Sequence, residues 1–189
     1  MITHDMKIQT ERLILRPFNE QDCDAMFRIQ GNPVMTRYTP DEPWKSIEEA
    51  YGFINLATRL YNNDKINDGF RYFFAVVEAQ SNNVIGYCGL GGPEFDRTLT
   101  EVFYGIEYSY WGKGYATETT KALLEYGFIN LMLDKIVGFA DKDNIASLRV
   151  LEKAGLKRIG IISGLEEKYK YFNGECLYQI DKISWEADK

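Results

Sequence analysis

The sequence predicts a mixed α/β fold in which helices cover a central sheet. Its 189 residues are 45% hydrophobic and 26% charged, which is typical of one globular domain. Hydrophobic periodicity gives the element order β-α-α-β-β-β-α-β-α-β-β, with about six to seven strands and about four helices. Three successive strands joined by short turns disfavour an all-parallel, doubly wound sheet. Because no linker or repeat interrupts this order, we expect residues 1–189 to form a single domain.

The first half of the chain predicts a strand, two helices and a pair of strands. Ser46-Ile47-Glu48-Glu49 is a capping box and predicts the start of the second helix. Asn82-Asn83, between two runs rich in aromatic and β-branched residues, predicts a tight turn. The expected elements are a strand over 11–17, helices beginning near 19 and 46, and strands over 70–78 and 84–90.

The second half alternates strands and helices before it closes on two strands. Gly112 and Gly114 precede a helix whose small and apolar residues recur on one face. Gly155 follows the next helix at the position of a C-terminal cap, and Asn173-Gly174 predicts the last turn. The expected elements are strands over 98–108 and 135–140, helices beginning near 115 and 144, and strands near 157–163 and 169–183.

The charge balance narrows the range of partners. The chain carries 22 Lys and Arg against 28 Asp and Glu, a net charge of −6. Binding to nucleic acid rests on many contacts from Lys and Arg to phosphates, so we expect no nucleic-acid partner. An acidic surface suits a cationic or small-molecule partner better, although such a surface often serves only solubility.

The histidine and cysteine residues limit which kinds of metal site and which cellular compartment we expect. The single histidine is His4, and Cys23, Cys88 and Cys176 lie far apart in the chain. These residues lack the spacing of a metal site, so we expect no metal. Free cysteines suit a reducing compartment, and neither a signal peptide nor a membrane-spanning run is visible. We therefore expect a cytoplasmic protein with no membrane partner.

The segment from Trp111 to Glu118 reads Trp-Gly-Lys-Gly-Tyr-Ala-Thr-Glu and joins an expected strand to an expected helix. Its glycines let the backbone turn sharply, and the amides at a helix N-terminus form a cradle for an anion such as a pyrophosphate. A tight turn without a ligand is the alternative. The segment is neither a Walker A loop nor a dinucleotide-binding fingerprint.

Three segments resemble GNAT-superfamily N-acetyltransferases of the RimJ/RimL-like subgroup. Residues 111–118 are similar to the acyl-CoA pyrophosphate loop of that family, Gln/Arg-x-x-Gly-x-Gly/Ala, with Trp111 in place of the first residue. Residues 10–17, Thr-Glu-Arg-Leu-Ile-Leu-Arg-Pro, resemble the opening strand of the subgroup. Residues 144–156, which begin Asn-Ile-Ala-Ser, resemble one of its helices. The three segments stand in the order expected of the family, and the resemblance covers nearly the whole chain.

The resemblance implies transfer of an acetyl group from acetyl-CoA, the co-substrate, to a primary amine. It also implies a twisted, mostly antiparallel sheet that is splayed in the middle to admit acyl-CoA. A bulge at Gly105 would open this splay, and packing is the alternative reason for that glycine. The residues expected at acetyl-CoA are Ile106, Glu107 and Tyr108 for pantetheine, Trp111, Gly112, Lys113, Gly114, Tyr115, Ala116 and Thr117 in the loop, and Asn144, Ser147 and Lys153 beyond it.

Catalysis needs a base for the amine and an acid for the CoA thiolate. Glu101 is the first candidate for the base and Glu107 the reserve, while a plain exposed strand residue is the alternative for Glu101. The tyrosine that serves as the acid in many members of the family is replaced by Leu151. Ser147 is the substitute, as proton donor or CoA partner, although Asn144 and Ser147 also suit a helix start.

Two further residues have roles that the sequence leaves open. Lys153 suits either a CoA phosphate or the C-terminal end of its helix. Cys88 has no histidine to activate it, so an acetyl-cysteine intermediate is disfavoured. We expect direct attack of the amine in a ternary complex.

The acceptor has several candidates. The resemblance suggests a protein N-terminal amine, as on a ribosomal protein, and polyamines, aminoglycosides and amino acids are the alternatives. Arg37, Tyr38 and Trp44 are expected at the acceptor mouth, or else as packing residues of a loop. Because the family tyrosine is missing, a non-catalytic acyl-CoA sensor is a further alternative. The subgroup implies a monomer or a homodimer.

Overall fold

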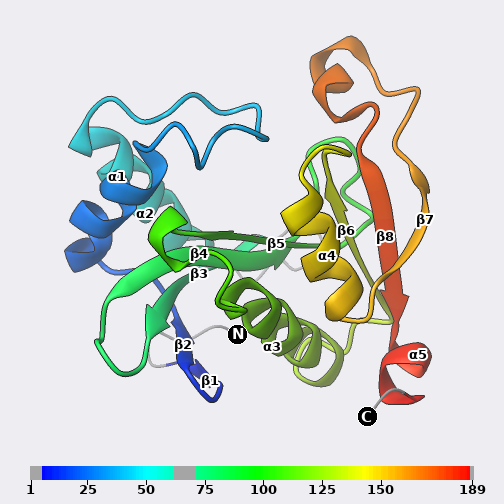
Figure 1. Cartoon of the computed structure of the whole chain (residues 1–189), viewed down its shortest axis with the longest axis horizontal. Coiled ribbons are helices and arrows are strands. Elements are labelled where there is room, and N and C mark those ends of the chain that lie inside the picture. Colours follow the sequence, from blue (N-terminus) through cyan, green and yellow to red (C-terminus); the bar gives the residue numbers. More distant parts are fainter. Residues whose placement is uncertain (1–5, 62–70, 188–189) are drawn as a thin grey trace.

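The computed structural model describes residues 6–61 and 71–187, so His4 and the first residue of the strand expected from residue 70 lie outside the described part (Figure 1). The described residues form one open sheet of eight strands in the order β1-β2-β3-β4-β5-β6-β8-β7. The mixed α/β fold predicted from the sequence is therefore confirmed. The strands are β1 (Ile8–Gln9), β2 (Leu13–Arg16), β3 (Arg71–Glu78), β4 (Val84–Gly91), β5 (Glu101–Ile106), β6 (Lys135–Ala140), β7 (Lys157–Ile161) and β8 (Cys176–Asp181).

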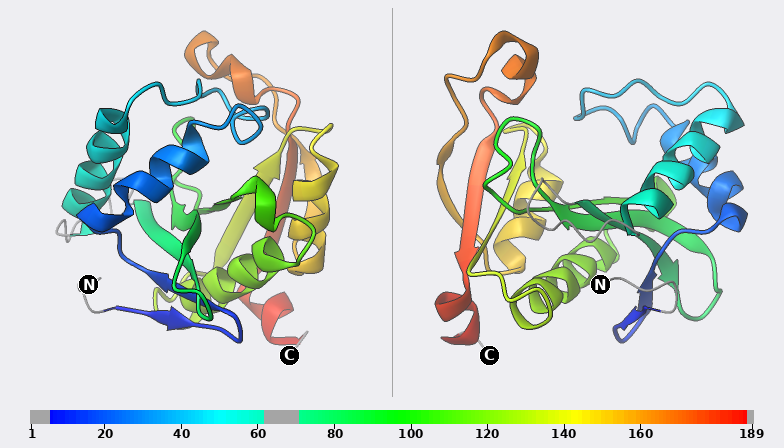
Figure 2. Two further views of the ribbon diagram at one scale, coloured as in Figure 1. Left: turned by 60° about the vertical axis from the view of Figure 1, so that its left-hand side comes forward. Right: turned by 180° about the vertical axis from the view of Figure 1, so that it is seen from behind.

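Helices cover both faces of this sheet. α1 and α2 pack on β4 and β3, while α3 packs below β5 and β2 on the opposite side (Figures 1 and 2). α4 packs on β6 and β7 and contacts α3. The α-helices are α1 (Cys23–Gln30), α2 (Ile47–Tyr61), α3 (Tyr115–Ile129), α4 (Ile145–Lys153) and α5 (Lys182–Ala187), and the 3-10 helices are Glu20–Asp22, Tyr108–Tyr110 and Glu167–Phe172.

The sheet consists of two halves joined at a single parallel contact. Every other neighbouring pair of strands is antiparallel, but β5 and β6 run parallel and pair only at Glu101 and Val137. There the backbone N–H of Val137 donates to the carbonyl of Thr100 at 2.8 Å. Beyond this pair the two strands diverge, as Figure 1 shows. The expected splay in the middle of the sheet is present.

Local sequence signals account for the element ends. Asn19 caps the first 3-10 helix by accepting the Gln21 N–H, and the Glu49 carboxylate accepts the Ser46 N–H at 3.0 Å, as a capping box requires. Gly155 follows α4 with φ +100, the left-handed conformation that ends many helices. Gly174 has φ +101 in the predicted last turn. These short-range signals place the helices and turns where the sequence predicted them.

The prediction of a bulge at Gly105 is wrong. The β4–β5 ladder runs from Gly86 opposite Ile106 to Gly91 opposite Glu101 without a shift in register. A Cβ atom on Gly105 would lie 2.4 Å from Cε1 of Tyr87, the residue directly opposite. Glycine is therefore required by the Tyr87 ring, which was the packing alternative. The splay arises instead at the other edge of β5.

Four other elements differ from expectation. β1 and α5 are additional. The strand expected over residues 98–108 is shorter, and its end is set by the 3-10 helix that begins at Tyr108. The strand expected near residues 169–183 is also shorter, because the chain forms a 3-10 helix over Glu167–Phe172 before β8 and enters α5 at Lys182. In the described ranges 6–61 and 71–187, no helix has both the length and the hydropathy needed to cross a bilayer.

Candidate functional site

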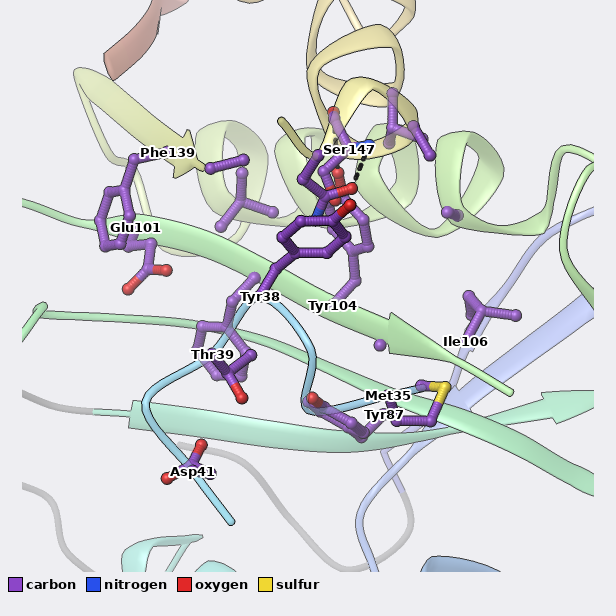
Figure 3. Close-up of a pocket in the computed structure, with 18 of the residues that line it drawn as sticks. Met35, Tyr38, Thr39, Asp41, Tyr87, Glu101, Tyr104, Ile106, Phe139 and Ser147 are labelled. Carbon is purple, nitrogen blue, oxygen red and sulfur yellow. Dashed lines mark hydrogen bonds between the residues drawn. The ribbon is translucent and has the colours of Figure 1, made fainter. Parts of the chain in front are cut away.

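A cavity of about 940 Å³ lies where β5 and β6 diverge. Its wall is formed by α2, β3, β4, β5, the start of α3, the end of β6, α4 and residues 93–94, together with two loops, one over residues 31–46 and the other over residues 162–175. Figure 3 shows the part of this wall around β5 and α4. The first loop belongs to the N-terminal half of the sheet and the second to the C-terminal half (Figure 1).

One backbone edge of β5 faces this cavity and, within the described residues, pairs with no strand beyond Glu101. The N–H of Glu107 donates to the carbonyl of Ile85 in β4 at 2.8 Å, so odd-numbered residues of β5 direct their backbone groups toward β4. The backbone groups of Tyr104 and Ile106 therefore point toward β6, where the ladder has already ended. The Trp111 indole N–H donates to the Ile106 carbonyl. This edge can accept further hydrogen bonds from an extended ligand that carries amides.

Side chains of β5 alternate between two regions of the cavity. The Tyr104 hydroxyl reaches α4 and donates to the carbonyl of Ser147 at 3.2 Å. Figure 3 shows the Glu101 carboxylate turned away from Ser147, toward the side on which Asp41 lies. Burial raises the pKa of Tyr87 to about 12, and the negative charges of Asp41 and Glu101 add to this rise. β5 thus separates a region near α4 from an acidic region.

The turn into α3 has the geometry of an anion cradle. Gly112 has φ +75 and Gly114, which caps the helix, has φ +84. No atom lies within 4 Å of a Cβ built on Gly112, so the space above the turn is open. Backbone N–H groups in the first turn of a helix have no intrahelical partner, and the helix dipole places positive charge there. This turn suits a phosphate or pyrophosphate.

The first strands hold this turn in place. The Arg12 Nε donates to Glu118 Oε2 at 2.7 Å, and an Arg12 Nη atom donates to the carbonyl of Lys113 at 3.0 Å. The Thr10 hydroxyl donates to Glu118 Oε1 at 2.6 Å. These bonds lower the pKa of the partly buried Glu118 against the opposing effect of burial. The segment around residue 10 is thereby tied to the glycine turn, more than 100 residues later in the chain.

The start of α4 contributes polar groups to the same cavity. Asn144 caps the helix, since its side chain accepts the Ser147 N–H at 3.2 Å, so the capping alternative for Asn144 is confirmed. Arg149 and Lys153 are four residues apart, are exposed and line the cavity. Leu151 is 2% exposed and offers no hydroxyl.

The acidic region receives residues from both halves of the sheet. Tyr38, Asp41 and Trp44 come from the loop over residues 31–46. Glu175, next to the first residue of β8, also lines the cavity and is 6% exposed. Burial raises the pKa of Glu175 to about 7, and the negative charge of Asp141 adds to the rise.

Most residues predicted for the site line this one cavity. Those lining it are Tyr38, Trp44, Glu101, Ile106, Trp111, Gly112, Gly114, Tyr115, Ala116, Thr117, Asn144, Ser147 and Lys153.

The other four predicted residues do not line the cavity. Glu107 pairs with Arg28 at 3.0 Å, and its N–H is already bonded within the sheet. Tyr108 packs edge-on against Trp111, Lys113 lies over the Tyr110 ring, and Arg37 lies over the Tyr38 ring.

Sequence reasoning missed Tyr104, Arg149 and Glu175. The four-residue spacing between Arg149 and Lys153 was a usable signal, because such residues share one face of a helix. Nothing near Glu175 in the sequence indicates its burial.

Cys88 is a packing residue, as predicted. Its side chain is fully buried, and burial raises the pKa of its thiol well above the ordinary value. A thiol in this environment remains protonated and is a poor nucleophile. Cys23 and Cys176 are likewise buried and free.

Known proteins match this chain over most of its length. The acetyltransferase (GNAT) domain matches residues 12–157. An uncharacterized N-acetyltransferase of Bacillus subtilis (strain 168) is 32% identical, with 88% of this chain and 89% of the relative covered. A spermidine N(1)-acetyltransferase of Escherichia coli (strain K12) is 28% identical, with 87% of this chain and 85% of the relative covered.

Solved structures share the fold. An acetyltransferase of the GNAT family from Bacillus anthracis superposes with a TM-score of 0.75 at 26% identity, covering 94% of this chain and 99% of its own. RimL, a ribosomal-protein α-N-acetyltransferase in complex with coenzyme A, superposes with a TM-score of 0.75 at 17% identity, covering 93% of this chain and 98% of its own. The latter likeness concerns the fold alone.

Proposed function

Because this chain belongs to the acetyltransferase (GNAT) domain family, we propose that it moves an acetyl group from acetyl-CoA to a primary amine by direct attack in a ternary complex. Acetyl transfer is the activity of the family. The observation that carries the proposal is the backbone edge of β5 that opens onto the cavity beside the glycine turn of α3. The identity of the acceptor and the roles of single residues are the parts that we propose.

The residues around the cavity fit acetyl-CoA. The backbone groups of Tyr104 and Ile106 suit the amides of pantetheine, as a third strand would. The amides around Gly112 and Gly114 suit the pyrophosphate. Arg149 and Lys153 suit a further phosphate at the exposed rim. When bound, acetyl-CoA supplies the acyl thioester.

Glu101 is our candidate for the base. A lysine-like amine has a pKa near 10.4 and is mostly protonated at neutral pH, so it must lose a proton before it can attack. Glu101 lies in the wall of the cavity on β5, and its carboxylate faces the acidic region, away from Ser147. A carboxylate in this position can take the proton directly or through one water molecule.

Two hydroxyls near α4 are candidates for the acid that protonates the CoA thiolate. Ser147 lines the cavity in the first turn of α4. Tyr104 lies beside it, and burial raises the pKa of its hydroxyl, which keeps the proton in place. Because the Tyr104 proton is engaged with the Ser147 carbonyl, we assign the donor role to Ser147.

We propose a ribosomal-protein N-terminal amine as the acceptor, which the fold shared with RimL supports only by analogy. A small cationic amine is the second candidate, and two observations favour it. A relative of this chain is named as a spermidine acetyltransferase, and Asp41, Glu101 and Glu175 give the cavity an acidic region. Leu151, which offers no hydroxyl, is the one feature that favours a sensor without turnover.

We also propose that the enzyme works as a single cytoplasmic domain, as a monomer or homodimer. The three buried, free cysteines agree with a reducing compartment. Sedimentation of the full chain measures the oligomeric state directly.

The proposed function is tested by measuring release of free CoA thiol. The purified chain is incubated with acetyl-CoA and a panel of N-terminal peptides, polyamines, aminoglycosides and amino acids. We expect acceptor-dependent release with sequential kinetics. Tight binding of acetyl-CoA without release for any acceptor would instead identify a sensor, and ping-pong kinetics lost in Cys88→Ala would overturn direct transfer.

A further inference from the structure

We propose that Glu175 binds a second positive charge on the acceptor, so that the preferred acceptor carries an ammonium or guanidinium group in addition to the amine that is acetylated. This inference rests on the proposed function and names the class of its acceptor. The argument depends on how Glu175 is held, on the charges around it, and on its position relative to Glu101.

Glu175 is held by backbone hydrogen bonds, while its carboxylate accepts none from the part of the chain that the structure describes. Its N–H donates to the Phe172 carbonyl at 3.2 Å, and its carbonyl accepts the Ile162 N–H at 2.9 Å. The residue is 6% exposed and still lines the cavity. No hydrogen bond or ion pair from the residues that the structure describes reaches the carboxylate. The carboxylate oxygens are not among the described buried atoms that lack a hydrogen-bond partner, so they are open to the cavity and can accept from a donor that comes from outside the chain.

Carboxylates lie near Glu175. Burial raises the pKa of Glu175, and Asp141, after β6, raises it further. Burial also raises the pKa of Tyr171 to about 12, and Glu175, Asp141 and Asp41 add to this rise, so three carboxylates act on one hydroxyl at this end of the cavity. Their charges would attract a cation and would repel an anionic ligand.

Lysines on the neighbouring segments are engaged elsewhere. Lys142 pairs with Asp143 at 2.7 Å in solvent, and Lys170 pairs with Glu167. The chain itself therefore supplies no cation to the Glu175 carboxylate in the described residues. Arg149 and Lys153, the cations of the cavity wall, lie on α4, where they suit a phosphate.

The raised pKa of Glu175 favours a cationic ligand. Burial without a donor destabilises the ionised form and moves the pKa to about 7. A bound cation would stabilise the carboxylate and lower this pKa again. Affinity for the cation should therefore rise with pH from about 6 to 8, and binding near pH 7 should release part of a proton.

The two carboxylates lie on opposite halves of the sheet. Glu101 is on β5, in the N-terminal half, and Glu175 precedes β8, in the C-terminal half. A ligand whose reacting amine lies at Glu101 and that also pairs with Glu175 must carry a second positive charge. A diamine meets this requirement, and a monoamine does not.

The test compares 1,4-diaminobutane with butylamine, which has the same carbon chain and one charge fewer. We measure CoA thiol release by the full chain, by Glu175→Gln, and by Glu166→Gln as a control on the same loop but outside the cavity wall. In the unaltered chain, the KM for the diamine should be at least about tenfold lower than that for butylamine, a difference of about 1.4 kcal/mol. Glu175→Gln should remove this difference, with the butylamine KM and the kcat little changed, and it should flatten the pH dependence of the diamine KM between pH 6 and 8.

Equal effects of Glu175→Gln on both amines, or no effect on either, would overturn the inference. Calorimetric titration of 1,4-diaminobutane into the protein in the presence of CoA provides a readout without turnover. If no acceptor supports thiol release, the proposed function fails, and the titration still decides whether Glu175 binds the diamine. Diamine affinity that is equal in the unaltered chain and in Glu175→Gln refutes the site in either case.

Discussion

Arg12 and Glu118 join the turn between β1 and β2 to the start of α3 through both a side-chain and a backbone hydrogen bond. The Arg12 side chain donates to Glu118 Oε2 at 2.7 Å, and its backbone N–H donates to Oε1 at 2.9 Å. The same guanidinium bonds the Lys113 carbonyl inside the glycine turn and lies 4.6 Å from the centre of the Tyr115 ring. The shape of the anion cradle therefore depends on a residue far from it in sequence.

Arg12→Ala should weaken binding of acetyl-CoA without abolishing it. The contact is partly exposed, so we expect a loss of about 1 kcal/mol, or about fivefold in Kd. Calorimetric titration with CoA measures this effect. Lys168→Ala, which removes an exposed pair with Glu166, is the control and should leave Kd unchanged. An unchanged Kd in Arg12→Ala would show that the glycine turn keeps its shape without this contact.

Gly112→Ala and Gly164→Ala form a matched pair. Both glycines have φ +75, and neither has an atom within 4 Å of a built Cβ. Both variants should therefore lose about 1–2 kcal/mol of stability for the same backbone reason. Only Gly112→Ala should also weaken CoA binding, because only Gly112 lies at the start of α3. Similar loss of CoA affinity in both variants would count against the cradle.

Glu101→Gln should lower kcat by about 10²- to 10³-fold while leaving the Kd for CoA unchanged. The amide keeps the size of the side chain and cannot accept the proton of an ammonium. Thiol-release assays across pH should also lose the rise in rate with pH that a base produces. Glu166→Gln is the control. Turnover that is unchanged at neutral pH would exclude Glu101 as the base.

Ser147→Ala should reduce kcat more than Tyr104→Phe does. We expect a reduction of about 10- to 100-fold for Ser147→Ala. The effect of Tyr104→Phe should be smaller, because the Tyr104 hydroxyl already donates to the Ser147 carbonyl and mainly positions that turn. Steady-state kinetics with saturating acetyl-CoA compare the two variants. The opposite order would transfer the donor role to Tyr104.

Glu175→Gln should stabilise the protein at alkaline pH. The folded pKa of about 7 lies above the ordinary value of 4.5, so the folded state keeps a proton that the unfolded state loses between these values. Stability therefore falls as pH rises from about 4.5 to 7, and the full cost is present above 7. We expect a difference on the order of 2–3 kcal/mol between the variant and the unaltered chain at pH 8, and almost none near pH 4.5. Thermal unfolding at both pH values measures it, and an equal difference at both would contradict the raised pKa.

Local signals made most of the fold predictable. Capping boxes, C-terminal glycines and tight turns depend only on residues close together in the chain, so they can be predicted from sequence. The examples here are Ser46 with Glu49, Gly155, and Asn173-Gly174. β1 was not predicted because two residues, Ile8 and Gln9, are too few to show an alternating hydrophobic pattern. They form a strand by pairing with β2. α5 is six residues long and ends the described chain. Short elements of this kind depend on their tertiary neighbours.

The parts of the site that carry a sequence motif could be predicted. The parts that depend on packing between residues far apart in the chain could not. The glycines at 112 and 114 signal a turn by themselves. Gly105 has two explanations in sequence, and only the Tyr87 ring on the opposite strand distinguishes them. The environment of Glu175 is built by Phe172, Ile162 and Asp141, and burial by such neighbours has no signature in the sequence around residue 175.

The single parallel contact between Glu101 and Val137 has a consequence for how this enzyme can change over evolution. The two loops at the end of the cavity where we propose the acceptor are attached to different halves of the sheet, and β5 and β6 pair only at Glu101 and Val137 in the described residues. Insertions or substitutions in either loop should therefore alter acceptor choice while leaving the turn at α3 intact. Laboratory selection for new amines should accumulate changes over residues 31–46 and 162–175 and leave the start of α3 intact.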